Sequence, residues 1–101
     1  MTNENYCDII RAQRLEVYMS KESRVALISI IVEKGDSVAR LNEILHNYSE
    51  YVIGRMGIPY REKNISIISI AIDAPEDVIN TLTGNIGKLD GVTAKATYSK
   101  V

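Results

Sequence analysis

The segment from His46 to Glu62, HNYSEYVIGRMGIPYRE, holds the chain's only histidine and three of its six tyrosines. A histidine can act as a general base or bind a metal ion. The first role needs a nucleophile and an orienting group close by, and the second needs several His, Cys, Asp or Glu side chains at ligand spacing. The sequence shows neither arrangement around His46. We therefore predict no catalytic residue, no metal site and no cofactor, and we expect His46 to lie at the surface.

Four other residues are better candidates for binding a small ligand. Gly35, Asp36 and Ser37 belong to the segment EKGDS (33–37), where a glycine turn meets the start of a predicted helix. Free N–H groups at a helix start favour anions and small polar ligands. Arg61 belongs to a predicted hairpin turn, where it either protects the sheet edge or contacts an anionic ligand. These four residues are the predicted ligand-binding site.

The segment GNIGKLDGV (84–92) carries three glycines and raises the question of a phosphate-binding loop. A P-loop requires GxxxxGK[ST], and the dinucleotide fingerprint requires GxGxxG between a strand and a helix. Neither pattern is present. The glycines instead indicate how a helix packs and ends. Gly84 suits a close approach of the helix to the sheet, and Gly91 suits the position just after the helix end.

The composition is that of one small globular domain. The chain has 101 residues, of which 46% are apolar and 25% charged, and its net charge is −1. This charge balance gives no basic surface for nucleic acid or for an anionic membrane. The single cysteine, Cys7, excludes an internal disulfide, and the apolar runs are too short to cross a bilayer. We read no secretory signal and expect a cytoplasmic protein.

Hydrophobic spacing predicts the secondary structure. Residues 25–32 and 65–72 are continuous apolar, β-branched runs, which are typical of strands covered on both faces. Two other segments repeat apolar residues at three- and four-residue spacing, as amphipathic helices do. The expected order is a strand at 25–32, a helix carrying Val38 to Tyr48, strands at 52–61 and 65–72, a helix carrying Val78 to Leu89, and a strand at 92–98.

Turn and cap residues set the boundaries of these elements. Asp36 or Ser37 is the expected N-cap of the first helix, and Pro75 suits the first position of the second helix. Asn64 tolerates the left-handed conformation of the turn before the third strand.

The strand at 52–61 is predicted to lie at a sheet edge, because Pro59 cannot donate a hydrogen bond to a neighbouring strand. Four of its apolar residues fall at even positions, which is the spacing of a strand. These residues are Val52, Met56, Ile58 and Tyr60.

The order βαββαβ predicts an α+β, ferredoxin-like sandwich. In this fold the antiparallel sheet has the spatial order 4-1-3-2, and both helices cover one face. The first and third strands are central, and these are the two all-apolar ones in this chain. Residues 1–24 are polar and only partly helical in spacing. We therefore predict a flexible N-terminal tail at 1–24 and one domain at 25–101.

Two helices cover only one face of such a sheet, yet its central strands are apolar on both faces. An apolar face of this size needs a cover. We therefore predict a homo-oligomer, a dimer or a tetramer, that pairs through the sheet. The N-terminal tail is the alternative cover.

From about residue 24 onward, the chain resembles a small bacterial family named as regulators of iron-only hydrogenase systems. The resemblance is carried by LNEILHNYSEYVIGRMGIPYREKNISIISI (41–70) and by LTGNIGKLDGV (82–92). It implies a stand-alone ACT-like regulatory domain that pairs through its sheet. ACT-like domains tend to bind small molecules at subunit contacts, near the turn after the first strand. In this chain that turn is Glu33 to Ser37.

The same family is similar to the regulatory half of the nickel-responsive repressors. The positions that match the nickel ligands of those repressors, three histidines and one cysteine, carry Ser49, Gly57, Pro59 and Ile65 here. His46 matches a neighbouring histidine that is not a ligand. The repressors also carry a ribbon-helix-helix DNA-binding half, which the short N-terminal segment cannot supply. The resemblance therefore implies a similar scaffold without the nickel site and without direct DNA binding.

These observations favour a regulatory, ligand-sensing domain over an enzyme. Such a domain would act through a small-molecule effector or a protein partner, in transcription or maturation of an iron-only hydrogenase system. Two alternatives remain open. One is a small enzyme on the ferredoxin-like fold, although an acylphosphatase-like glycine loop would need an arginine that EKGDS lacks. The other is a pure oligomerisation module.

Because none of the four matching positions carries a nickel ligand, we expect no tight nickel site. Calorimetry with Ni²⁺ should show no stoichiometric binding tighter than about 10 µM, which corresponds to roughly −7 kcal/mol. A tight site that disappears in His46→Ala would contradict the match to the repressors.

Overall fold

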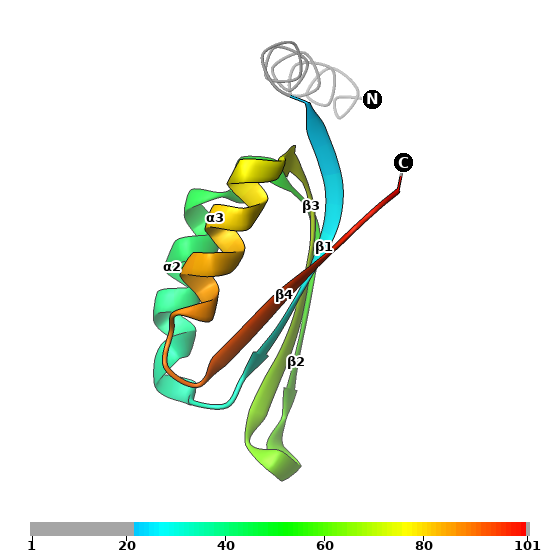
Figure 1. The fold of residues 1–101 in the computed structure, drawn as a ribbon. Coiled ribbons are helices and arrows are strands. Elements are labelled where there is room, and N and C mark those ends of the chain that lie inside the picture. Colours follow the sequence, from blue (N-terminus) through cyan, green and yellow to red (C-terminus); the bar gives the residue numbers. More distant parts are fainter. Residues whose placement is uncertain (1–21, 101) are drawn as a thin grey trace, which may run out of the picture.

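The described residues, 22–100, form the predicted succession βαββαβ in the computed structural model of the chain (Figure 1). Short 3-10 helices join several of these elements. In chain order the elements are β1 (Ser23–Val32), η1 (Gly35–Ser37), α2 (Val38–Asn47), η2 (Ser49–Tyr51), β2 (Val52–Tyr60), η3 (Arg61–Lys63), β3 (Ile65–Pro75), α3 (Glu76–Gly87) and β4 (Val92–Tyr98).

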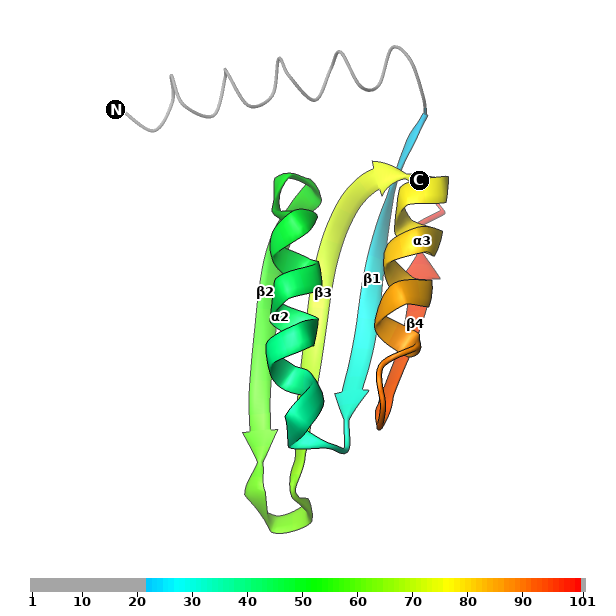
Figure 2. The same cartoon turned by 90° about the vertical axis from the view of Figure 1, so that its left-hand side faces the viewer.

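The strands form one antiparallel sheet in the order β2-β3-β1-β4. The strands β1 and β3 are central, and both helices cover the same face (Figures 1 and 2). Read from the other edge, the order is 4-1-3-2, so the predicted α+β, ferredoxin-like topology is confirmed. The all-apolar strands are central because a strand paired on both sides loses most of its contact with water.

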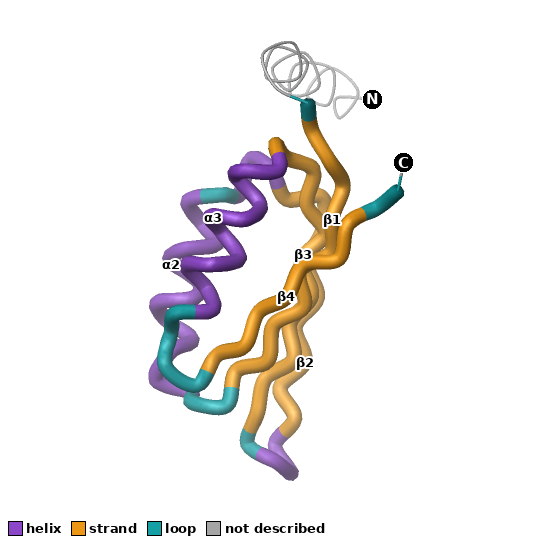
Figure 3. The backbone as a smooth tube through the Cα atoms, in the orientation of Figure 1, coloured by secondary structure: helices purple, strands orange, loops and turns teal. Residues whose placement is uncertain are grey.

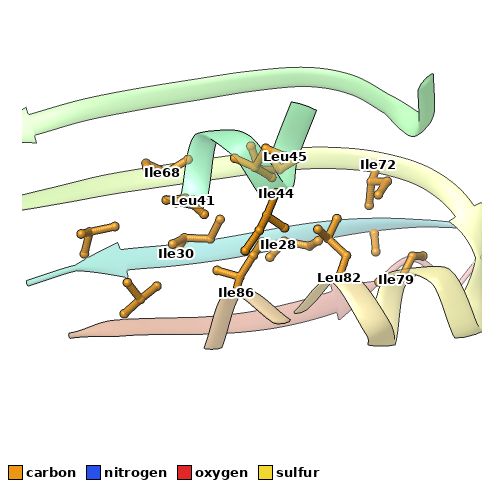
Figure 4. Close-up of a cluster of buried hydrophobic side chains, with 14 of the residues drawn as sticks. Ile28, Ile30, Leu41, Ile44, Leu45, Ile68, Ile72, Ile79, Leu82 and Ile86 are labelled. Carbon is orange, nitrogen blue, oxygen red and sulfur yellow. The ribbon is translucent and has the colours of Figure 1, made fainter. Parts of the chain in front are cut away.

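The hydrophobic core lies between the helices and the sheet. The even-numbered residues of the central strands point toward the helices, and Ile28, Ile30, Ile70 and Ile72 are fully buried. Burying each such side chain contributes about 1.5–3 kcal/mol, which makes this layer the main source of stability. The facing helices present residues at three- and four-residue spacing: Leu41, Ile44 and Leu45 on α2, and Ile79, Leu82 and Ile86 on α3 (Figure 4).

The strand β2 departs from the predicted alternation. Its pairing with β3 shifts by one residue between Val52 and Gly54, so Ile53 forms a β-bulge. A bulge moves the residues beyond it to the opposite face of the sheet. Val52 therefore points to the helices, so the even positions of β2 do not share one face. The even positions beyond the bulge point away from the helices: Met56, Ile58 and Tyr60.

Both helix starts differ from the prediction in detail. Ser37 precedes α2, as predicted, but its hydroxyl donates to the Asp90 carbonyl oxygen at 2.6 Å and caps no helix N–H. Pro75 is the last residue of β3, and α3 begins one position later, at Glu76. The strand extends this far because its last residues still pair with β1, as far as Ser23.

The fold depends on the backbone conformation of Gly91. This glycine has a φ of +71°, and a Cβ on it would lie 2.6 Å from Cγ of Lys34. It lies in the turn beyond the C-cap Lys88, and not directly after the helix end as predicted. The predicted close approach at Gly84 is wrong, since Gly84 is exposed and a Cβ there would meet no atom within 4 Å.

Arg24 links the start of β1 to the start of α3 and to the end of β4. Its Nη1 donates to Glu76 Oε1 at 3.1 Å, and its Nη2 donates to the Ser99 carbonyl oxygen at 3.2 Å. Its guanidinium carbon also lies 4.5 Å from the centre of the Tyr98 ring. These contacts explain why β1 begins at Ser23, two residues before the predicted strand.

The predicted tail, 1–24, lies mostly outside the described residues, which begin at residue 22. The boundary between tail and domain therefore stays a prediction. Within residues 22–100, no helix is long and apolar enough to cross a membrane.

Replacing Gly91 with alanine is expected to lower the free energy of unfolding by about 1–2 kcal/mol, because a positive φ is costly for any L-residue. The added Cβ would also meet the Lys34 side chain. Gly35→Ala is the matched control, since a Cβ at Gly35 meets no atom within 4 Å and its backbone is not left-handed. Urea denaturation measures both variants. Equal stability of Gly91→Ala and Gly35→Ala would contradict the strain assigned to Gly91.

Candidate functional site

The predicted ligand-binding turn lies at the end of β1. Gly35 and Asp36 are exposed in η1. Ser37 is buried, and its hydroxyl is already bonded to the Asp90 carbonyl oxygen. The Ser37 N–H also donates to the Lys34 carbonyl oxygen at 3.1 Å. The turn therefore leaves Gly35 and Asp36 exposed and uses Ser37 for its own structure.

The turn between α3 and β4 holds this segment in place. Lys34 Nζ lies 2.9 Å from Asp90 Oδ2, and the Glu33 N–H donates to the Gly91 carbonyl oxygen at 2.7 Å. Lys34 donates a hydrogen bond to the Asp90 carboxylate, and this bond and the negative charge of the carboxylate raise the pKa of Lys34. Because the ion pair is exposed, it contributes little to stability. Its main effect is to position the two turns against each other.

Arg61 lies in η3 at the tip of the β2–β3 hairpin, at the same end of the sheet as η1 (Figure 1). Asn64 closes this hairpin in the predicted left-handed conformation, with a φ of 55°. Within residues 22–100, no hydrogen bond or ion pair joins Arg61 to η1. The predicted ligand-binding residues therefore share one end of the molecule but belong to two separate loops.

A pocket that the sequence analysis did not find lies at the other end of α2. We call it the α2–β2 pocket; its volume is about 330 Å³. Its walls come from α2, η2 and β2, and its floor comes from β3. Four polar and three apolar residues line it: Asn42, His46, Ser49 and Arg55, and Leu45, Val52 and Ile70.

One hydrogen bond joins the two walls of the α2–β2 pocket. Arg55 Nη2 donates to Asn42 Oδ1 at 2.7 Å. No acidic residue is among the lining residues, so the Arg55 guanidinium is the permanent charge of the pocket. Among the described residues, no three His, Cys, Asp or Glu side chains lie close enough together to hold a metal ion.

Sequence reasoning missed the pocket for a physical reason. The four-residue spacing of Asn42 and His46 places both on one side of a helix and is visible in the sequence. The contribution of Arg55 is not visible in the sequence, because it depends on the β-bulge at Ile53. Arg55 pairs with the buried Ile70, and directly opposite residues share a face, so the guanidinium lies on the helix side.

The face of the sheet away from the helices is uncovered within residues 22–100 (Figure 3). We call it the open face. It is formed by Val25, Leu27, Ser29 and Ile31 of β1, Gly54, Met56, Ile58 and Tyr60 of β2, Ile65, Ile67, Ser69, Ala71 and Asp73 of β3, and Thr93, Lys95 and Thr97 of β4. Large apolar side chains remain exposed on it, such as Leu27 at 47%, Met56 at 52% and Ile58 at 46%.

Comparison with known proteins assigns this chain to a family. Residues 24–96 match the TM1266-like family, described as "Iron-only hydrogenase system regulator, putative". The match includes both segments that carry the resemblance noted in the sequence.

The solved structures similar to this chain include the following two. Protein TM1266 from Thermotoga maritima has a TM-score of 0.75 and 35% identity, over 78% of this chain and 100% of that one. A formyltetrahydrofolate deformylase from Pseudomonas putida KT2440 has a TM-score of 0.55 and 13% identity, over 72% of this chain and 28% of that one. The second likeness shows the fold alone. The comparison with curated proteins gives no match.

Ser37→Ala is expected to cost about 1 kcal/mol of stability, because it removes a hydrogen bond to the partly buried Asp90 carbonyl oxygen. Asp36→Ala is the control on the neighbouring exposed residue and should change stability by less than about 0.5 kcal/mol. Urea denaturation of both variants measures the difference. A loss at Asp36 as large as that at Ser37 would show that the turn is held by contacts other than the Ser37 hydroxyl.

Proposed function

Since the chain belongs to the TM1266-like family of iron-only hydrogenase system regulators, we propose that it works as a homo-oligomeric regulatory domain. In this proposal the chain is not an enzyme. It responds to a small-molecule effector or to a protein partner, and it transmits the response through the contact between subunits. The regulated step is transcription or maturation of the hydrogenase system.

The open face is the observation that carries this proposal. The helices bury one side of the sheet, whereas Leu27 of β1 and Met56 of β2 on the other side remain about half exposed. Fully burying a side chain of this size is worth about 1.5–3 kcal/mol. A partner that covers several such residues at once therefore gains enough free energy to offset the cost of association.

A second copy of the chain suits this surface. Among its strand residues, the open face carries one basic and one acidic side chain, Lys95 on β4 and Asp73 on β3, so two copies do not repel each other. The apolar residues lie on β2, β3 and β1, and β4 adds a polar border. An apolar centre with a polar border is the usual anatomy of a specific interface. A two-fold axis lets the same patch serve both partners.

Both places where an effector could bind adjoin strands of the open face. The turn η1 directly follows β1, and Val52 and Arg55 of the α2–β2 pocket belong to β2. A ligand that shifts either strand would change the fit between two open faces. We therefore propose that effector binding and pairing are coupled, and such coupling is reciprocal by thermodynamic necessity.

Light scattering on the full chain should give a mass at least twice the 11.3 kDa of one chain at micromolar concentration. Leu27→Asp should shift the protein toward the monomer, because it places a charge in the apolar centre of the interface. Asn85→Asp adds the same charge on an exposed position of α3 and should leave the mass unchanged.

Deletion of residues 1–18 separates the two possible covers of the open face. If a second copy covers it, the shortened chain keeps the oligomeric mass. A full chain that is monomeric, and that associates only after the deletion, would show that the N-terminal segment covers the face and would contradict the proposal.

A further inference from the structure

We propose that the α2–β2 pocket binds a small organic carboxylate with a short apolar chain. This inference rests on the proposed function, because it gives the chemical class of effector to which the regulatory domain responds. It places that effector away from the turn at Gly35 to Ser37 and from Arg61.

The helix side of the pocket is formed by residues whose spacing along the chain places them on one side of α2. The pairs Asn42/Leu45 and His46/Ser49 are three residues apart, and Asn42/His46 and Leu45/Ser49 are four apart, so these residues line one side of α2 and of η2 that continues it. Leu45 is buried in the core, whereas His46 and Ser49 are exposed. The helix therefore gives the pocket an apolar base and polar groups nearer to solvent.

The strand side is built by the β-bulge. Val52 and Arg55 have opposite parity, and without the bulge they would lie on opposite faces of β2. The shift at Ile53 turns both toward the helix layer, opposite the buried Ile72 and Ile70. A bulge that re-aims one side chain is a common device next to binding sites. In this chain it brings a guanidinium to a helix that already presents Asn42 and His46.

The polar groups of the pocket are mainly hydrogen-bond donors. Because Asn42 Oδ1 accepts from Arg55, the two hydrogens of the Asn42 amide nitrogen are left to donate elsewhere. Arg55 keeps further N–H groups, and Ser49 and His46 each add a donor. Among the described residues, the side chains of His46 and Ser49 make no hydrogen bond to another residue. A donor-rich pocket lined by no carboxylate favours an anion.

The charge and the lining select a carboxylate among anions. The lining holds one permanent positive charge, which matches one negative charge better than the near-double charge of a phosphate monoester. A guanidinium also binds a carboxylate in a planar, bidentate geometry. The apolar base of Leu45, Val52 and Ile70 leaves room for a short hydrocarbon chain behind the carboxylate.

The size of the pocket supports a small ligand. Its volume of about 330 Å³ lies at the lower end of the roughly 300–1,000 Å³ that is usual for ligand sites. Val52 and Arg55 of β2, an edge strand, form one side of the pocket, and α2, which lies in front of β2 and β3 in Figure 2, forms another. A ligand can therefore enter from the side without any movement of the core.

The test is an NMR titration of the ¹⁵N-labelled full chain with sodium butyrate at constant ionic strength. We expect saturable shifts of the backbone amides of Asn42, His46, Ser49 and Arg55. Butyramide has the same shape without the charge and should give no saturable shift. Arg55→Gln should weaken butyrate binding at least tenfold, while its amide spectrum shows that it remains folded.

Two control variants address the site predicted from the sequence. Arg61→Gln makes the same change in charge on the hairpin, and Gly35→Val fills the turn after β1; both should bind butyrate like the unmodified chain. Equal binding by Arg55→Gln and the unmodified chain would overturn the proposal. So would the absence of saturable shifts at the pocket amides, or a loss of binding in Gly35→Val or Arg61→Gln alone.

This outcome is independent of the test of the proposed function. A chain that pairs in light scattering but gives no butyrate shifts at the pocket loses only the ligand assignment. A monomeric chain that binds butyrate through Arg55 keeps the pocket and loses pairing through the open face.

Discussion

The structure depends on one asymmetry: β1 and β3 are apolar on both faces, and the helices of the described chain cover only one of them. The covered face supplies the core, where Ile28 and Ile70 are fully buried. The same β-branched runs that make good central strands also place Leu27 and Ile67 on the open face. The same residue pattern therefore produces both the core and the apolar surface through which we propose that two copies pair. Polar substitutions on the open side of these strands would weaken the proposed pairing and leave the core unchanged.

A second local feature, the β-bulge at Ile53, connects the fold to a possible effector. It leaves Met56 and Ile58 on the open face while it turns Arg55 toward α2. One edge strand thus contributes apolar surface to the proposed interface and a guanidinium to the α2–β2 pocket. An effector held by Arg55 would act on a strand that belongs to the proposed interface, which is a direct physical route from ligand to assembly. Regulation by this domain requires no catalytic group, only a difference in pairing between the two ligand states.

The sequence predicted the topology because its periodicities are long and consistent. The β-branched, apolar runs at 25–32 and 65–72 predicted the two central strands, and the helix faces followed from apolar spacing. It failed where a tertiary contact overrides a local preference. Ser37 was expected to cap α2, but its hydroxyl donates a hydrogen bond to the Asp90 carbonyl oxygen instead. The bulge at Ile53 and the pocket that depends on it leave no pattern in the residues themselves. Of the predicted turn site, Gly35 and Asp36 are exposed at the end of β1. Their role in ligand binding stays a prediction.

The central claim is that a second copy of the chain covers the open face. Isotope-filtered NOE spectroscopy on an equal mixture of ¹³C-labelled and unlabelled chain tests it most directly, because it reports contacts between subunits only. The claim predicts intermolecular NOEs from the methyl groups of Leu27, Ile58 and Ile67. Intermolecular NOEs confined to the helix layer, or contacts to these methyl groups found only within one chain, would contradict it.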